Sequence, residues 1–270
     1  TLARTSTPIS GRLGTTVSAA LANKSSRRRA RWFNTMRRYY PKLHRLIAVS
    51  QGVADDVIAI TDMPDRQVTV VRNPTVTPAM LSAAALPVEH PWFAKDAPPV
   101  VLGVGRLTEQ KDFPTLLRAF AEVAKQRDAR LIILGEGQLR EALLEQARQL
   151  GIADKVAFPG FTDNPWAWMR RAAVFVLSSR WEGSPNTLTE ALALGTPVVS
   201  TDCPSGPREL LSGGNIAPLV PMGDITALSE AILSTLSNPP EAATLVNAVK
   251  DYHQDVSAKG YLDALGLITR

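Results

Sequence analysis

The sequence lacks several features that would assign it to a special class of protein. It has one cysteine, Cys203, which excludes an internal disulfide and fits a reducing compartment. No run of about 18 apolar residues occurs, so we expect no membrane-spanning segment. The G-x-x-x-x-G-K-[ST] pattern of triphosphate-binding loops is absent as well. What remains is a globular composition, 45% hydrophobic and 20% charged, in 270 residues that suit one large domain or two modest ones.

Acidic residues are missing from the segment 24–45, which is otherwise rich in charge. Its cations are Lys24, Arg27, Arg28, Arg29, Arg31, Arg37, Arg38, Lys42 and Arg45, and Trp32, Phe33, Tyr39 and Tyr40 lie among them. Such a segment can lie on an anionic membrane surface or contact phosphate groups. It can equally be the solvated face of a helix. Because no nucleic-acid motif accompanies the charge, we expect no nucleic-acid partner.

The first part of the chain predicts few regular elements, and residues 1–24 show little periodicity. We expect a helix at 26–40, a buried strand at 46–49, a helix opened by Ser50 as its N-cap, and a strand at 67–71. Prolines then recur up to position 98, so we interpret 76–98 as an interdomain linker.

From residue 99 onwards, predicted strands alternate with predicted helices. The strands are expected at 100–104, 131–134, 156–158, 174–177, 198–200 and 216–220, and the helices at 113–126, 138–150, 166–171, 185–194 and 225–236. This alternation implies parallel pairing through right-handed crossovers, and therefore an α/β fold with a doubly wound sheet. Ligands of such sheets bind at the carboxyl ends of the strands.

The first two of these strands end in glycine-rich turns that carry charge. Gly105 and Arg106 follow the first strand, with Lys111 five positions further on, and a Gly-Glu-Gly turn at 135–137 follows the second. Glycines let the backbone approach a ligand closely, and two cations at this spacing can hold phosphate oxygens from two sides. Taken alone, both cations can also be ordinary loop residues.

The stretch R-W-E-G-S-P-N-T-L-T-E-A-L-A-L-G places two glutamates eight positions apart. Ser184 followed by Pro185 predicts an N-cap and first turn for the helix 185–194. Glu182 precedes this helix, and Glu190 lies off its apolar face, so they can be a loop acid and a solvent-facing helix residue. The free amides at the helix start lie between them and favour an anion. A diphosphate that joins two hydroxyl-rich groups would fit this arrangement.

The same residues resemble the retaining, GT-B-fold glycosyltransferases of family 4, also called glycosyl transferases group 1. The resemblance covers about 140 residues in consistent order. It is carried by V-L-G-V-G-R-L-T-E-Q-K-D-F at 101–113, L-I-I-L-G-E-G at 131–137, V-A-F-P-G-F at 156–161, the two glutamates within E-G-S-P-N-T-L-T-E-A-L-A-L-G-T-P-V-V, P-S-G-P-R-E-L-L at 204–211, and A-P-L-V-P-M-G-D-I-T-A-L-S-E-A-I at 217–232.

The resemblance implies a GT-B fold with a doubly wound, Rossmann-like donor domain at 99–250 and a partial, Rossmann-like acceptor-side domain at 1–75. The last segment, 251–270, would be a helix that returns to the N-terminal domain. Relatives have a larger N-terminal domain with a glycine-rich loop and an important histidine after a strand. None of His44, His90 and His253 has that context, so we expect the natural protein to begin upstream of Thr1.

The resemblance also implies a role for each site residue. Arg106 and Lys111 would neutralise the departing diphosphate, Glu182 would face the donor sugar, and Glu190 would bind the ribose hydroxyls. The remaining donor-binding positions would be Gly105, Gly135, Glu136, Gly137, Gly183, Ser184, Pro185, Asn186, Thr187 and Leu188. No metal and no cofactor are expected beyond the nucleotide sugar, which is a co-substrate.

The function implied is transfer of a sugar, from a UDP-sugar by preference, to a glycan or lipid-linked acceptor with retention of configuration. The expected process is the assembly of cell-surface polysaccharide, and the expected location is the cytoplasm. Peripheral contact with the inner face of the cell membrane is an alternative location. Two alternatives stay open. One is a non-catalytic nucleotide-sugar-binding fragment, since this chain alone can bind the donor and still be inactive, and the other is a non-hydrolysing UDP-sugar epimerase.

Overall fold

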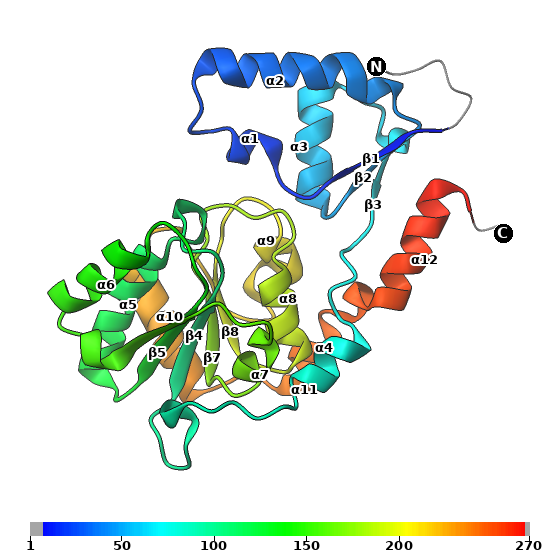
Figure 1. Ribbon diagram of the computed structural model, residues 1–270. Coiled ribbons are helices and arrows are strands. Elements are labelled where there is room, and N and C mark those ends of the chain that lie inside the picture. The colour runs from blue at the N-terminus through cyan, green and yellow to red at the C-terminus, as the bar shows by residue number, and fades with distance from the viewer. Residues whose placement is uncertain (1–7, 268–270) are drawn as a thin grey trace.

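The computed structural model describes residues 8–267, which build two separate parallel β-sheets (Figure 1). The smaller sheet has the order β1-β2-β3 and carries three helices; we call this part the small-sheet unit. Its elements are β1 (Ser10–Leu13), α1 (Val17–Ala20), α2 (Ser26–Tyr39), β2 (Arg45–Ala48), α3 (Gln51–Thr61) and β3 (Val68–Val70). Ser50 caps α3 as the sequence predicts, because its hydroxyl accepts a hydrogen bond from the amide of Val53 at 3.3 Å.

The larger sheet has six parallel strands in the order β6-β5-β4-β7-β8-β9. Together with the helices packed on it, it forms the large-sheet unit. The strands are β4 (Val100–Val104), β5 (Arg130–Leu134), β6 (Val156–Gly160), β7 (Val174–Leu177), β8 (Val198–Thr201) and β9 (Leu219–Val220). The predicted α/β, doubly wound architecture is therefore confirmed.

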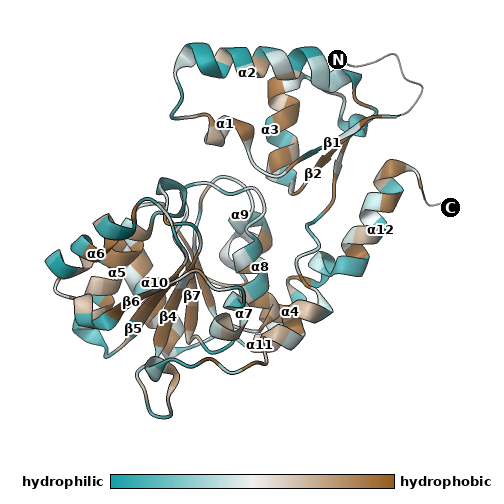
Figure 2. Cartoon of the chain, viewed as in Figure 1, coloured by the Kyte–Doolittle hydropathy of each residue, from teal (hydrophilic) through white to brown (hydrophobic). Residues whose placement is uncertain are grey.

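Helices cover both faces of the large sheet, and each face has its own apolar core. The helices of one face are α5 (Phe113–Gln126), α6 (Arg140–Gln149) and α10 (Ile225–Ser237). Those of the other face are α4 (Pro78–Ala83), α7 (Pro165–Met169), α8 (Asn186–Ala193), α9 (Pro207–Leu210) and α11 (Ala242–Asn247). Figure 2 shows the strands between these layers as the most hydrophobic part of the chain.

The order of the strands reverses between β4 and β7, and this reversal positions the candidate site. From β4 the chain proceeds to β5 and β6 on one side, and then crosses back to β7, β8 and β9 on the other. The loops that follow β4 and β7 therefore diverge at adjacent strand ends and leave a crevice there.

The chain returns to the small-sheet unit at its end, through α12 (Gln254–Leu265). Ala264 of α12 packs against Ile47 and Val71, and the hydroxyl of Tyr261 accepts a hydrogen bond from Arg12 at 2.7 Å. Within residues 8–267, no helix combines the length and the apolar character needed to cross a bilayer.

Three local expectations need correction. The segment 1–24 was expected to show little periodicity, and its described part, 8–24, contains β1 and α1, which are too short to produce a periodic pattern. Residues 1–7 lie outside the described residues. The stretch 76–98 contains α4, which Thr77 caps, and the apolar core of the large-sheet unit buries Met80. The strand expected at 216–220 is only β9, because Pro218 has no amide hydrogen to extend the ladder.

Replacing Phe120 by Ala should lower the free energy of unfolding by about 3–5 kcal/mol, because the ring is fully buried in the apolar core on the α5 side of the large sheet. Urea unfolding followed by circular dichroism measures this change. The matched control is Phe161→Ala, since that ring is 74% exposed and should cost no more than about 0.5 kcal/mol. Equal losses in the two variants would contradict the assignment of the core.

Candidate functional site

A buried ion pair joins the loops that follow β4 and β7. The ammonium Nζ of Lys111 lies 2.7 Å from Oε1 of Glu182, and these side chains are only 15% and 8% exposed. The hydroxyl of Ser179 donates a second hydrogen bond to the same oxygen at 2.7 Å. The one cysteine, Cys203, is buried near this ion pair. Its burial and the nearby Glu182 carboxylate raise the pKa of its thiol to about 12, so the thiol stays protonated and unreactive.

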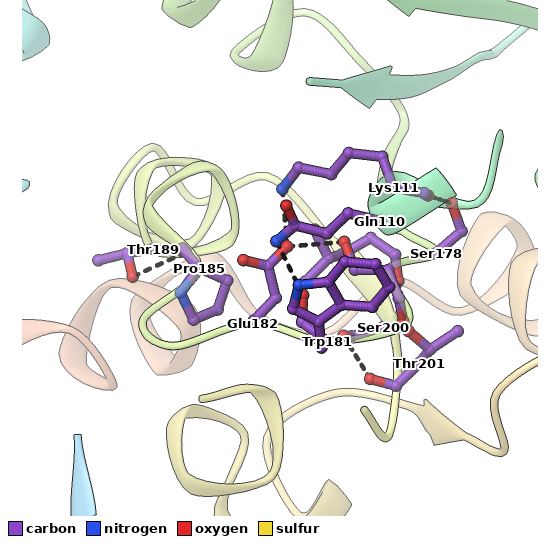
Figure 3. A network of polar contacts seen from close by, with 11 residues as sticks. Gln110, Lys111, Ser178, Trp181, Glu182, Pro185, Thr189, Ser200 and Thr201 are labelled. Carbon is purple, nitrogen blue, oxygen red and sulfur yellow. Dashed lines mark hydrogen bonds and ion pairs between the residues drawn. The ribbon is translucent and has the colours of Figure 1, made fainter. Parts of the chain in front are cut away.

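Further hydrogen bonds tie the turn before α5 to the loop after β7. Ser178 donates through its hydroxyl to the carbonyl oxygen of Lys111 at 2.7 Å, and Gln110 donates through its amide to the carbonyl of Trp181 at 3.0 Å. The backbone amide of Arg180 donates in return to the carbonyl of Gln110 at 2.8 Å. These hydrogen bonds join the two loops into one wall of the crevice. Figure 3 shows Gln110, Lys111, Ser178 and Trp181 within this network.

The start of α8 differs from the prediction. Ser184 is not the N-cap: Pro185 occupies that position, α8 begins at Asn186, and no side chain caps the helix. The hydroxyls of Ser184 and Thr187 are buried and have no hydrogen-bond partner. Buried polar atoms are rarely left without partners, so this group of unpartnered hydroxyls beside a helix start is suited to an anionic ligand.

Glu190 lies on α8 in a partly buried position and not on a solvent-facing surface. Burial raises the pKa of its carboxyl group, whereas the nearby indole of Trp166 and the ammonium of Lys111 act in the opposite direction. The buried indole nitrogen of Trp166, on α7, is near enough to this carboxylate to affect it, but it does not meet the geometry of a hydrogen bond with any protein atom. A hydroxyl-rich ligand at this place could accept from the indole and donate to the carboxylate.

A cavity of about 320 Å³ lies beside these groups, at the carboxyl ends of β4, β5 and β6. It is lined by Val104, Gly105, Arg106, Leu134, Gly135, Glu136, Phe161, Thr162 and Pro165. Gly135 has to be a glycine, because a Cβ atom there would stand 2.0 Å from the carbonyl oxygen of Gly105. The aromatic and aliphatic walls, with polar backbone at one end, suit a flat heterocyclic ring.

The small-sheet unit contacts this wall directly. Thr15 forms an isolated antiparallel bridge with Gly183, and the hydroxyl of Thr16 donates to the carbonyl oxygen of Glu182 at 3.0 Å. A Cβ atom on Gly183 would lie 2.3 Å from the carbonyl oxygen of Gly14, so only glycine permits this approach. Asn186 accepts a further hydrogen bond from the amide of Asn73 at 2.8 Å.

A second contact between the two units lies at α9. The carboxylate of Glu209 accepts a hydrogen bond from the backbone amide of Gln51 at 3.1 Å, at the start of α3, and also pairs with the guanidinium of Arg72. The hydroxyls of Ser50 and Ser205 lie 2.8 Å apart. A carboxylate at a helix start is favourable because it meets the positive end of the helix dipole.

The structure brings most of the predicted residues together. Gly105, Arg106, Gly135 and Glu136 line the cavity, whereas Lys111 and Glu182 hold each other in the adjoining wall. Gly137 does not line the cavity and lies against the backbone of Leu107. The side chain of Leu188 is fully buried in the core, so only its backbone can face a ligand. The proposed roles of these residues remain predictions.

Several residues around the site escaped sequence reasoning. Phe161 and Trp166 follow β6 and could have been found from the strand-end rule that identified the other turns. Ser179 and Thr16 carry no local signal, since only the folded chain brings their hydroxyls to Glu182.

Comparisons with known proteins agree on one family. A family model described as Glycosyl transferases group 1 matches residues 89–252. N-acetylgalactosamine-N,N'-diacetylbacillosaminyl-diphospho-undecaprenol 4-alpha-N-acetylgalactosaminyltransferase of Campylobacter jejuni is 30% identical over 199 residues, which cover 74% of this chain and 52% of that protein. Lipopolysaccharide core biosynthesis glycosyltransferase LpsE of Rhizobium meliloti is 32% identical over 195 residues, which cover 72% of this chain and 54% of LpsE.

A solved structure shares the fold. HepE of Anabaena in complex with UDP aligns with a TM-score of 0.78 at 20% identity, over 97% of this chain and 72% of HepE.

The chain spans about half the length of the two curated relatives, because it covers 52% and 54% of them.

Lys111→Met should lower the free energy of unfolding by about 3 kcal/mol, because the carboxylate of Glu182 would stay buried without a counter-charge. Chemical denaturation measures the loss. Lys125→Met is the control, since Lys125 pairs with Glu122 on the surface and should cost less than about 1 kcal/mol. The same loss of unfolding free energy in both variants would contradict the interpretation of Lys111 and Glu182 as a buried ion pair that stabilises the fold.

Glu190→Gln should gain stability relative to the wild-type protein as pH rises from 4 to 7. Burial raises the pKa of Glu190 above its usual 4.5, so the unfolded chain loses this proton at lower pH than the folded one does. Its contribution to stability is therefore complete below about pH 4.5 and declines as pH rises through the folded pKa. Urea unfolding at pH 4 and pH 7 measures the free energy of unfolding of both proteins. An equal difference between the two proteins at the two pH values would contradict this prediction.

Proposed function

We propose that this chain, which belongs to the glycosyl transferases group 1 family, binds a nucleotide diphosphate sugar at the crevice between β4 and β7 and transfers the sugar to a glycan or lipid-linked acceptor. The observation that carries this proposal is a set of buried polar atoms without hydrogen-bond partners around the start of α8 and on the neighbouring α7. These atoms are the hydroxyls of Ser184 and Thr187 and the indole nitrogen of Trp166. They provide donors for phosphate and ribose oxygens at the place where open α/β sheets bind ligands.

Each part of the donor has a matching part of the site. The cavity beside Gly135 and Phe161 suits the base. Glu190 would accept hydrogen bonds from the ribose hydroxyls, and the start of α8 would bind the diphosphate. Glu182 would face the sugar. Its Oε1 already accepts from Lys111 and Ser179, so its position is set before the donor arrives.

The chemistry would rest on fixed positive charge. When the bond between sugar and diphosphate breaks, negative charge builds on the departing phosphate, and Arg106, Lys111 and the amides of α8 would stabilise it. Because these groups supply the charge that a divalent ion supplies in other enzymes, we propose transfer without a metal. Retention of configuration is proposed only from the resemblance to the retaining glycosyltransferases. Activity that survives EDTA would agree with the first point, and NMR of the product linkage would test the second.

The donor and pathway are finer proposals. We choose UDP as the first nucleotide to test, because HepE, which shares the fold, was crystallised with UDP. The two curated relatives are named for lipid-linked oligosaccharide and lipopolysaccharide assembly, which favours cell-surface polysaccharide as the product. A chain of about half their length can also bind the donor without turning it over. Assay of the chain for release of UDP from a UDP-sugar, with and without a lipid-linked acceptor, separates this alternative from an active enzyme.

Glu190→Ala should weaken binding of UDP about tenfold to a hundredfold in isothermal titration calorimetry. The reason is that hydrogen bonds to a charged group contribute about 1.5–3 kcal/mol. Glu122→Ala is the control, because that glutamate lies on the exposed side of α5 and should leave affinity unchanged. ADP and GDP are titrated in the same way. If Glu190→Ala binds all three nucleotides as tightly as the wild-type protein does, the assignment of the donor site is refuted.

A further inference from the structure

We propose that the outer face of α2 is a docking surface for a membrane rich in anionic phospholipid. This face is defined by Arg27, Arg31, Asn34 and Arg38, which recur at helical spacing and are all exposed. They line an open groove of about 590 Å³ that runs along the helix. The inference does not depend on the donor site, which lies in the other unit.

The cations of this region are free to bind an external anion. Within residues 8–267, no lysine or arginine between positions 24 and 45 forms an ion pair with an acidic side chain. The acids of α3, which packs against α2, are engaged elsewhere. Asp56 accepts hydrogen bonds from the amides of Val17 and Ser18, and Asp55 accepts one from Gln51. Because none of these acids forms an ion pair with α2, the cations of the helix are available to an external anion.

The attachment of α2 leaves this charge facing outward. Met36 is the only buried residue of the helix, and it anchors α2 to the apolar cluster formed with α3. The 14 residues of α2 extend over about 21 Å along one edge of the molecule. Figure 1 shows this edge opposite the large sheet, and Figure 2 shows the helix as mainly hydrophilic.

Exposed aromatic side chains favour a lipid surface over other anions. Trp32 is 50% exposed and Tyr39 is 43% exposed. Trp32 lies beside Arg28 and Arg31, and Arg38 and Lys42 stand over the ring of Tyr39. Amphipathic rings of this kind are favoured at the level of lipid headgroups, and each cation near an anionic leaflet contributes roughly 1 kcal/mol. Because Met36 and its neighbours keep the apolar side of α2 covered, the helix would adsorb on the headgroups and would not insert.

The test is co-sedimentation of the full chain with vesicles of phosphatidylcholine mixed with phosphatidylglycerol, and with vesicles of phosphatidylcholine alone. We expect binding only to the anionic vesicles, and loss of binding at 1 M salt, where the screening length falls to about 3 Å. The triple variant Arg27→Gln, Arg31→Gln, Arg38→Gln should lower the partition coefficient about 100-fold, at roughly 1 kcal/mol per cation. Trp32→Ser should lower it further.

The matched control removes three positive charges from the exposed surface of the large-sheet unit and its leading segment, through Lys95→Gln, Arg170→Gln and Lys250→Gln. This control should keep most of the vesicle binding. An equal loss in the two triple variants would show that net charge alone drives adsorption and would overturn the proposal. Binding to a polynucleotide or to free phosphate but not to anionic vesicles would overturn it as well.

Discussion

The ion pair between Lys111 and Glu182 is the interaction on which the rest of the site depends. It spans the point where the strand order of the large sheet reverses, and together with the hydrogen bonds beside it the pair joins the loops that follow β4 and β7. An ion pair this well buried is stable only while both partners and their hydrogen bonds are present, and Ser179 completes the set. With this wall in place, the start of α8 and the carboxylate of Glu190 face one crevice.

Sequence reasoning succeeded where the physical signal is local. The apolar stripe of α5 predicted its bounds at 113 and 126, and the strand-end rule located the turns that form the cavity. It failed where a distant element decides the outcome. The Ser184–Pro185 pair has the composition of a helix cap, yet the hydroxyl is buried without a partner. Glu190 lies off the core face of its own helix, but α7 covers it with Trp166, which no pattern within α8 could indicate.

The two units differ in how their positively charged side chains are arranged. In the large-sheet unit, Lys111 is buried and matched by a carboxylate, so its position is fixed and its field acts at short range. In the small-sheet unit, the arginines of α2 are exposed and unmatched, so their combined field extends into solvent and salt screens it. The first arrangement suits the orientation of one bound molecule. The second suits attraction to an extended surface.

The contact of Thr15 and Thr16 with the loop at Glu182 and Gly183 has a thermodynamic consequence. The backbone segment that borders the crevice is the same segment that bonds to the small-sheet unit. A ligand that shifts this loop must therefore change the free energy of contact between the two units. By reciprocity, anything that alters how the units meet must change the affinity for that ligand by the same factor. Occupancy of the crevice and the arrangement of the two units are thus linked equilibria.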